Sequence, residues 1–206
     1  MSIVLVGSTS GSVTLQEPAI AGSTVLDLPA VSGTILTTGS SGQSIPKAAL
    51  PTGSVLQVVN TTKTDIFTTT STSFVDVTGF SASITPTSSS SKILVMVSFC
   101  FSANSGAGYP QTRILRGSTA VYVGDSAGSR TPALNLTYGY SQDNGYITPA
   151  SAQFVDSPAT TSATTYKVQL LQTAGNTAII GATGDDSNSS TRIRTASSIV
   201  LMEIAA

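Results

Sequence analysis

The residues that could do chemistry in this chain are few, and their types argue against catalysis. Histidine is absent, Cys100 is the only cysteine, and Glu17 and Glu203 are the only glutamates. Without histidine, neither a Ser-His-Asp triad nor a Cys-His pair can form. One cysteine cannot supply the four Cys or His ligands of a structural zinc site. We therefore expect a protein that is not an enzyme, with no catalytic residue, no metal site and no cofactor.

Carboxylates leave two further kinds of site to consider. A glycosidase needs two carboxylates about 5 to 10 Å apart, and nothing in the spacing of the aspartates indicates such a pair. The run Asp185-Asp186-Ser187-Asn188-Ser189 offers oxygen ligands of the kind that calcium takes. It lacks the glycine and the distal glutamate of an EF-hand loop. Because Asp, Asn and Ser are also common turn residues, we favour a turn here.

Tyrosines that lie among small polar residues are the best candidates for binding. Tyrosine beside Gly, Ser, Asn and Asp is a recurrent composition of binding loops, because the ring provides contact area at low entropic cost. Sugars stack on such rings, so a host surface glycan is the ligand class to consider. The alternative is packing against a neighbouring strand, above all for Tyr138 and Tyr140, at i and i+2. The candidate receptor-binding residues are Tyr109, Tyr140, Asp143, Asn144 and Tyr146.

Strands must position these loops. From residue 54 onwards, short apolar or alternating runs recur with turn signals about every 8 to 12 residues. This spacing is typical of an antiparallel β-sandwich or jelly roll. No window has the period of a ten-residue amphipathic helix. We expect strands at 55–59, 65–70, 74–85, 92–102, 112–116, 120–124, 134–140, 152–155, 165–172, 177–181 and 197–204.

Three of these runs allow finer predictions. Residues 92–102 are the most apolar, so they should form a central strand with Cys100 buried as a small hydrophobe. Residues 166–172 alternate in the way that predicts a half-buried strand. Arg192 and Arg194 are spaced to share one solvated face of a strand.

The first 40 residues contain a repeat. Gly11, Gly22 and Gly33 mark a period of eleven residues, and the first two units each hold a short strand that ends in Pro-Ala-x-x-Gly. Such units cannot bury an apolar face alone, which favours contacts between chains. We therefore expect an obligate homo-oligomer. The alternative is the edge of an ordinary β-meander. Gly, Ser and Pro then make 39–54 a linker. The predicted domains are an all-β leader at 1–53 for anchoring and oligomerisation, and a sandwich at 54–206.

Charge and hydropathy exclude two classes of partner. The net charge is −1, only 9% of the residues are charged, and the nine basic residues are scattered, so no nucleic-acid partner is expected. No apolar run approaches the ~20 residues that cross a bilayer, so no membrane insertion is expected. The start of the chain lacks the positive region of a secretory signal, which predicts synthesis in a cytoplasm.

The chain resembles phage tail-fibre and related virion proteins in several stretches. These are Gly11 to Gly39, Gln57 to Asn60, Thr68 to Gly79, Ser90 to Val95 and the closing run from Ser198 to Ile204. The resemblance implies a homotrimer, an N-terminal part joined to other virion proteins, and a tip that faces outward. It predicts a non-enzymatic virion protein, a tail-fibre subunit that contributes to host attachment. The alternatives are a capsid decoration or head-fibre protein, and a free-standing carbohydrate-binding module.

Overall fold

The computed structural model describes residues 3–6, 12–15, 47, 50–104, 108–136 and 145–206. The chain divides into two compact units, Met1–Ile45 and Pro46–Ala206. In the first unit, β1 (Ile3–Val6) pairs antiparallel with β2 (Ser12–Leu15). Most of the repeat lies outside the described residues, and the domain bounds 1–53 and 54–206 stay a prediction.

The second unit is built of strands, and no α-helix occurs among its described residues. Every run predicted to be a strand overlaps one, which confirms the all-β class. No helix in the described part of the chain is long and apolar enough to span a membrane. The strands are β3 (Val55–Lys63), β4 (Phe67–Thr69), β5 (Val75–Ile84), β6 (Lys92–Ala103), β7 (Pro110–Arg116), β8 (Thr119–Val121), β9 (Asn135–Leu136), β10 (Thr148–Asp156), β11 (Thr164–Gln172), β12 (Ala178–Ile180) and β13 (Ser197–Ile204).

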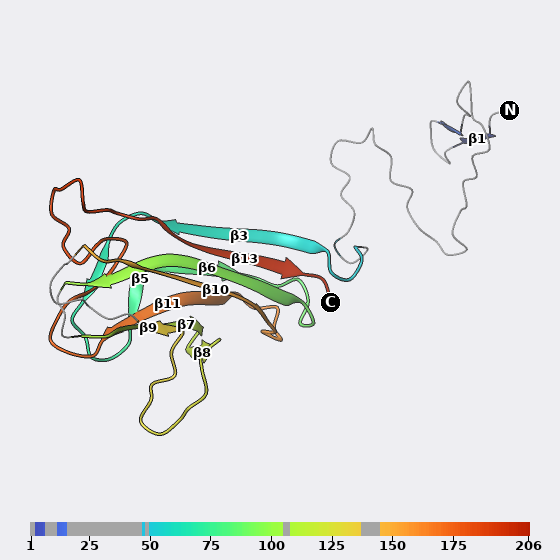
Figure 1. Cartoon of the computed structure of the whole chain (residues 1–206). Helices are drawn as coiled ribbons and strands as arrows, with labels where there is room; N and C mark the ends of the chain where they lie inside the picture. Colours follow the sequence, from blue (N-terminus) through green and yellow to red (C-terminus); the bar gives the residue numbers. More distant parts are fainter. Residues whose placement is uncertain (1–2, 7–11, 16–46, 48–49, 105–107, 137–144) are drawn as a thin grey trace, which may run out of the picture. The chain divides into compact units, whose positions relative to one another are not determined.

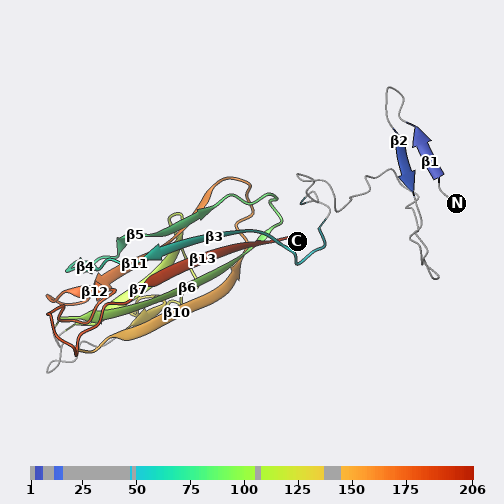
Figure 2. The same cartoon turned by 90° about the horizontal axis from the view of Figure 1, so that it is seen from above.

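These strands form two antiparallel sheets that pack face to face (Figures 1 and 2). In the six-stranded sheet, β6 pairs with β10 along one edge and with β13 and then β12 along the other. β3 and β4 lie outside β13 and β12 respectively. In the five-stranded sheet, β11 lies between β5 and β7, and the far edge of β7 pairs with β8 and β9.

The strand order is that of a jelly roll. Some consecutive strands pair with the same edge of a neighbour and can be counted as one strand: β3 with β4, β8 with β9, and β12 with β13. Each sheet then has four strands, in the order β10-β6-β12/β13-β3/β4 in one sheet and β5-β11-β7-β8/β9 in the other. Sequence neighbours such as β5 and β6 lie in different sheets, while β3 and β13, from opposite ends of the unit, are paired. This is the double Greek-key arrangement, and it confirms the predicted sandwich.

The core lies between the two sheets. Alternate residues of each strand point inward, as the period of two requires, and β6 contributes Ile93, Val95, Val97, Phe99 and Phe101. The ring of Phe99 meets that of Phe80 on β5 edge-on, with centroids 5.8 Å apart. Aromatic pairs in this geometry add stability beyond the area that they bury. β6 is thus the central strand that its composition predicts.

Two finer predictions are wrong. Cys100 is only half-buried, because the alternation that sends Phe99 and Phe101 into the core places Cys100 on the outer face of β6. The strand at 166–172 is half-buried only at its start: from Val168 to Gln172 both faces are buried. Its position between β5 and β7 covers its edges, and on its outer face Gln169 is hydrogen-bonded to Arg113 of β7 and Asp76 of β5.

Candidate functional site

The chain enters and leaves the sandwich at the same end, which we call the proximal end. The Gly53 backbone N–H donates to the Ala205 carbonyl at 2.8 Å, and the Ala205 N–H donates to the Ser54 carbonyl at 2.9 Å. β3 runs from this end over nine residues, or about 30 Å at ~3.4 Å per residue. Figures 1 and 2 show the C-terminus at one end of the sheets and several long connections at the other, the distal end.

The distal end carries both of the predicted binding tyrosines that the structure describes. Tyr109 directly precedes β7 and is 45% exposed, and Tyr146 precedes β10 and is 61% exposed. The register places them there, since Pro110 lies opposite Gln172 and Thr148 lies opposite Phe101. The other three candidates, Tyr140, Asp143 and Asn144, lie outside the described residues.

Hydrogen bonds fix Asn104 and Tyr109 to a second distal connection, residues 173–177. The Asn104 N–H donates to the Thr177 carbonyl at 3.0 Å, and the Thr177 N–H donates to the Asn104 side-chain oxygen at 2.8 Å. The Tyr109 N–H donates to the Thr173 hydroxyl at 2.9 Å. Asn104 and Tyr109 are therefore tied to residues 173–177, and the exposed ring of Tyr109 projects from this base, a common way in which rigid scaffolds present binding loops.

The connection from β12 to β13 adds a polar hollow that sequence reasoning did not find. The hollow measures about 270 Å³ and is lined by Asp186, Ser187, Asn188, Ser189, Arg192, Ile193 and Arg194. The Arg194 guanidinium binds both carboxylate oxygens of Asp186. This hydrogen bonding and the opposite charge lower the pKa of Asp186 and raise that of Arg194. The acidic run and Arg192-Ile193-Arg194 were both visible in the sequence, but nothing there pairs them.

The contacts of the acidic run are those of a turn that is paired with arginine. Asp185 accepts a hydrogen bond from the Ser187 N–H at 3.0 Å, which is an Asx turn, and its other oxygen lies 3.6 Å from Arg192 Nε. No group of three or more His, Cys, Asp or Glu side chains that could hold a metal ion occurs in the described part of the chain. Arg192 and Arg194 lie in the connection before β13, so the predicted strand face is wrong for them.

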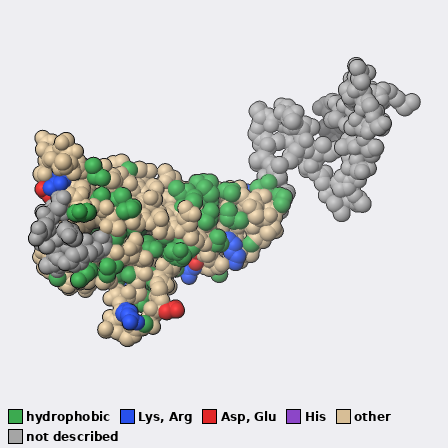
Figure 3. Space-filling model, viewed as in Figure 1, with side chains coloured by type: hydrophobic (Ala, Val, Ile, Leu, Met, Phe, Trp, Pro, Cys, Tyr) green, Lys and Arg blue, Asp and Glu red, His purple; other side chains and the backbone are tan. Residues whose placement is uncertain are grey.

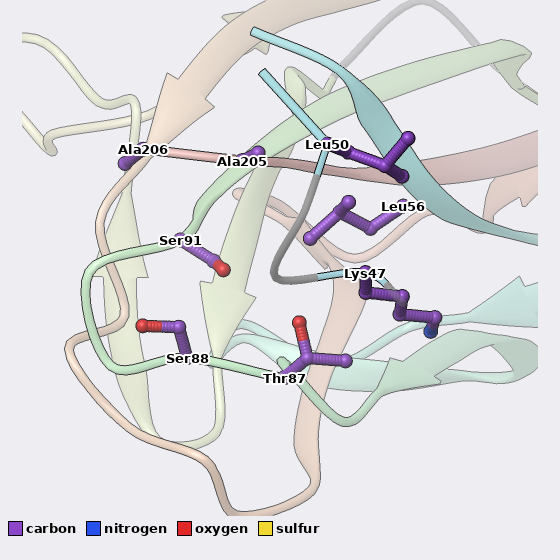
Figure 4. A pocket seen from close by; sticks show the side chains of 8 residues that line it. All are labelled: Lys47, Leu50, Leu56, Thr87, Ser88, Ser91, Ala205 and Ala206. Carbon is purple, nitrogen blue, oxygen red and sulfur yellow. The ribbon is translucent and has the colours of Figure 1, made fainter. Parts of the chain in front are cut away.

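A larger hollow lies at the proximal end. It measures about 420 Å³ and is lined by Lys47, Leu50, Leu56, Thr87, Ser88, Ser91, Ala205 and Ala206 (Figure 4). Behind it, the buried carboxylate of Glu203 accepts hydrogen bonds from Gln57, Ser91 and, twice, from Thr87. Its acceptor sites are therefore occupied by the protein itself, which is the arrangement of a structural carboxylate.

Asp156 occupies a similar position between the sheets. It accepts two bonds from Arg116 Nη1, at 2.7 and 2.8 Å, and one from the Tyr166 hydroxyl at 2.6 Å. Burial, with the nearby Asp156 carboxylate, raises the pKa of the Tyr166 hydroxyl. Glu203 and Asp156 thus stabilise the fold, whereas exposed aromatic and polar groups gather at the distal end. This arrangement suits binding of a polar surface ligand.

No protein-family model and no curated protein matches this chain. Among solved structures, the chain is similar to one described as the structure of infectious bursal disease virus Gt strain, with 17% sequence identity and a TM-score of 0.40. The match covers 97% of this chain and 46% of the other, so the chain spans about half the length of that protein. A likeness at this level assigns neither a family nor a function to the chain.

Proposed function

We propose that this chain is a non-enzymatic virion structural protein, a phage tail-fibre subunit that contributes to host attachment. The observation that carries the proposal is the polarity of the sandwich. Its first and last strands meet at the proximal end through Gly53, Ser54 and Ala205, while exposed Tyr109 and Tyr146 lie at the distal end. A subunit held at one end and exposed at the other needs this layout.

The leader supplies the attachment in this proposal. Its eleven-residue repeat, with Glu17 and Asp27 as the only charges before Lys47, needs partners to bury its apolar residues. The partners are other copies, in a homotrimer, and neighbouring virion proteins. Three distal ends in one trimer gain avidity when they engage one surface, so each site can be weak alone.

The contact surface in this proposal consists of Tyr109, Tyr140, Asp143, Asn144 and Tyr146, with a host surface glycan as the ligand class. Exposed tyrosine rings provide stacking faces, and neighbouring amides and carboxylates can bond sugar hydroxyls. The polar hollow beside Asp186 and Arg194 lies in the same half of the sandwich. It adds charged and hydroxyl groups to the surface that a sugar would meet.

A capsid decoration or head-fibre subunit is the second candidate, because jelly rolls are recurrent folds of capsid proteins. Lectin domains use the same fold, so a free-standing carbohydrate-binding module is the third. The repeat in the leader favours the first two, since a free module needs no anchoring segment. Fold alone does not choose among the three.

Imaging of whole particles tests the proposal. An antibody fragment or a tag fused at Ala206 should mark the tail of the particle, at its fibres. Marking of the head instead would replace the proposal with the decoration role. Absence of the chain from purified particles would leave the free-standing module.

A further inference from the structure

The outer face of the six-stranded sheet carries an apolar row that crosses the whole sheet. Val58, Met202, Leu94 and Val155 lie side by side on β3, β13, β6 and β10, as the registers show. Val58 is 55% and Val155 is 62% exposed, although both are large hydrophobic residues. In the next row, Val200 and Met96 are neighbours, flanked by Asn60 and Gln153. We call these six apolar residues the apolar face, and Figure 3 shows hydrophobic side chains gathered over β3 and β13.

The outer face of the other sheet differs, because charged and amide side chains extend over it while its leucines, Leu115 and Leu171, are buried. The Lys167 ammonium pairs with Asp76 at 2.7 Å, and the Gln169 amide donates to the same carboxylate at 2.6 Å. Arg113 donates to Gln169 at 2.8 Å and lies over the ring of Phe74, 4.1 Å from its centroid. Charged groups that bond one another in this way suit contact with water. The two faces of the sandwich are therefore built for different neighbours.

The apolar face carries almost no charge, so a second copy of the chain can approach it. Among the outward positions of β3, β6, β10 and β13, Lys92 is the one charged residue, and it lies at the proximal end of β6. The row beyond Val200 holds only hydroxyls, Thr62, Ser198, Ser98 and Ser151. Two such faces meet without like-charge repulsion. Apolar groups with neutral polar residues, and few charges at the centre, are the usual composition of interfaces.

The size of the face also fits a protein partner. Four strands ~4.8 Å apart and eight residues long at ~3.4 Å each give a footprint on the order of 500 Å². The relief of the side chains increases the accessible area above this footprint. If a partner covered the whole face, the accessible area buried on this chain would approach the ~800 Å² that each partner buries in a stable interface. Only part of this footprint is apolar, because one row is wholly apolar, the next is apolar at two of its four positions and the third holds hydroxyls. Contiguous exposed apolar surface generally marks an interaction site.

We propose that the apolar face is an interface between copies of this chain. The inference deepens the homo-oligomer of the proposed function, on which it rests, by assigning the contact to the sandwich itself in addition to the leader. It predicts that copies associate along the sheet that holds β3, β6, β10 and β13, and that the sheet with Lys167 and Asp76 stays in water.

Sedimentation velocity of the full chain at micromolar concentration tests this, with circular dichroism and thermal melting to verify folding. The double variant Val58→Glu with Val155→Glu places charges on the face at side chains that are more than half exposed. Ser81→Glu is the matched control, because Ser81 is exposed on the other sheet and lies opposite Lys167. Should the double variant fail to fold, Gln153→Lys puts a charge on the same face at an exposed polar position.

We expect the wild type and Ser81→Glu to sediment as the same oligomer and the charged-face variant to shift to smaller species. Oxidation by peroxide, followed by mass spectrometry, should modify Met96 and Met202 several-fold faster in the variant, because these half-buried residues lose their cover. A folded variant that sediments like the wild type and whose methionines react no faster overturns the interface while leaving the virion role intact. So does a monomeric wild type with protected methionines, which would mean that the leader covers the face.

Discussion

The Glu203 carboxylate and Thr87, 116 residues apart in the chain, share two hydrogen bonds, 2.6 Å from the Thr87 N–H and 2.7 Å from its hydroxyl. Ser91 and Gln57 donate to the same carboxylate. Burial alone would raise the pKa of Glu203, but these hydrogen bonds together hold it below the ordinary 4.5. Glu203 thus fastens the serine-rich turn before β6 to the last strand.

Replacement of Glu203→Gln should lower the free energy of unfolding by about 1.5 to 3 kcal/mol, the range for hydrogen bonds to a buried charged group. Thr87 and Ser91 donate to one carboxylate oxygen, which the amide oxygen can replace, whereas Gln57 donates to the other, where the NH2 group of glutamine cannot accept. The Gln57 donor therefore loses its partner, and the bonds from Thr87 and Ser91 lose their charged acceptor. Chemical denaturation at pH 7 measures the change. Ser89→Ala, an exposed position in the same turn, should be neutral. A change for Glu203→Gln below about 0.5 kcal/mol would contradict the role assigned to the carboxylate.

The free energy of unfolding should depend on pH through the ionisation of Glu203. Because the folded-state pKa of Glu203 lies below its ordinary 4.5, the stability that Glu203 adds is present above pH 4.5. It is lost as the pH falls below 4.5 through the folded-state value. Unfolding curves recorded from pH 6 downwards should therefore show a shallower acid loss in Glu203→Gln than in the wild type. Equal slopes would mean that other carboxylates account for the whole acid loss.

Tyr166→Phe should cost about 1 kcal/mol, because it removes the 2.6 Å hydrogen bond to Asp156 while the ring stays in the core. Asp156 retains Arg116, which limits the loss. Tyr122→Phe is the control: that side chain is 52% exposed and its ring stacks on Phe154 at 4.7 Å, a contact that phenylalanine preserves. Thermal melts of both variants measure the difference, and equal shifts would assign no stabilisation to the Asp156 bond.

Gly108→Ala should destabilise the distal end. A Cβ at this position would lie 2.5 Å from the side-chain oxygen of Gln172, which is fully buried and has little room to move. Overpacking of this kind costs about 1 to 3 kcal/mol. Gly175→Ala in the neighbouring connection meets nothing within 4 Å and should be tolerated. The two melting temperatures, compared with the wild type, test whether Gly108 packs against the Gln172 side chain as closely as this distance indicates.

Tyr109→Ala and Tyr146→Ala should each weaken adsorption of particles to host cells by about tenfold, the equivalent of ~1.4 kcal/mol, without lowering the melting temperature. Both rings are exposed, so little core packing is lost. Ser89→Ala at the proximal end serves as the control for adsorption. Loss of about 3 kcal/mol or more of stability, as for a core aromatic, would assign these rings to packing. Unchanged adsorption with unchanged stability would move the contact surface elsewhere.

The sequence by itself determined the fold class and which residues share a strand face. The alternation in β6 and β13 and the regular turn signals are local properties of the chain, so they are legible without any partner strand. The same is true of the missing histidine, which removes whole classes of catalytic site. The exposed tyrosines could also be singled out, because binding-loop composition is local.

Only the tertiary structure decided which face points inward and which segments meet. A period of two does not say which of two sets is buried, and this is why Cys100 was expected in the core and lies outside it. Partners in a jelly roll are distant in sequence: β3 pairs with β13, and Thr87 bonds Glu203. Four apolar residues from four strands make one exposed row only when β3, β13, β6 and β10 align, because strand order is set by packing of the whole sandwich.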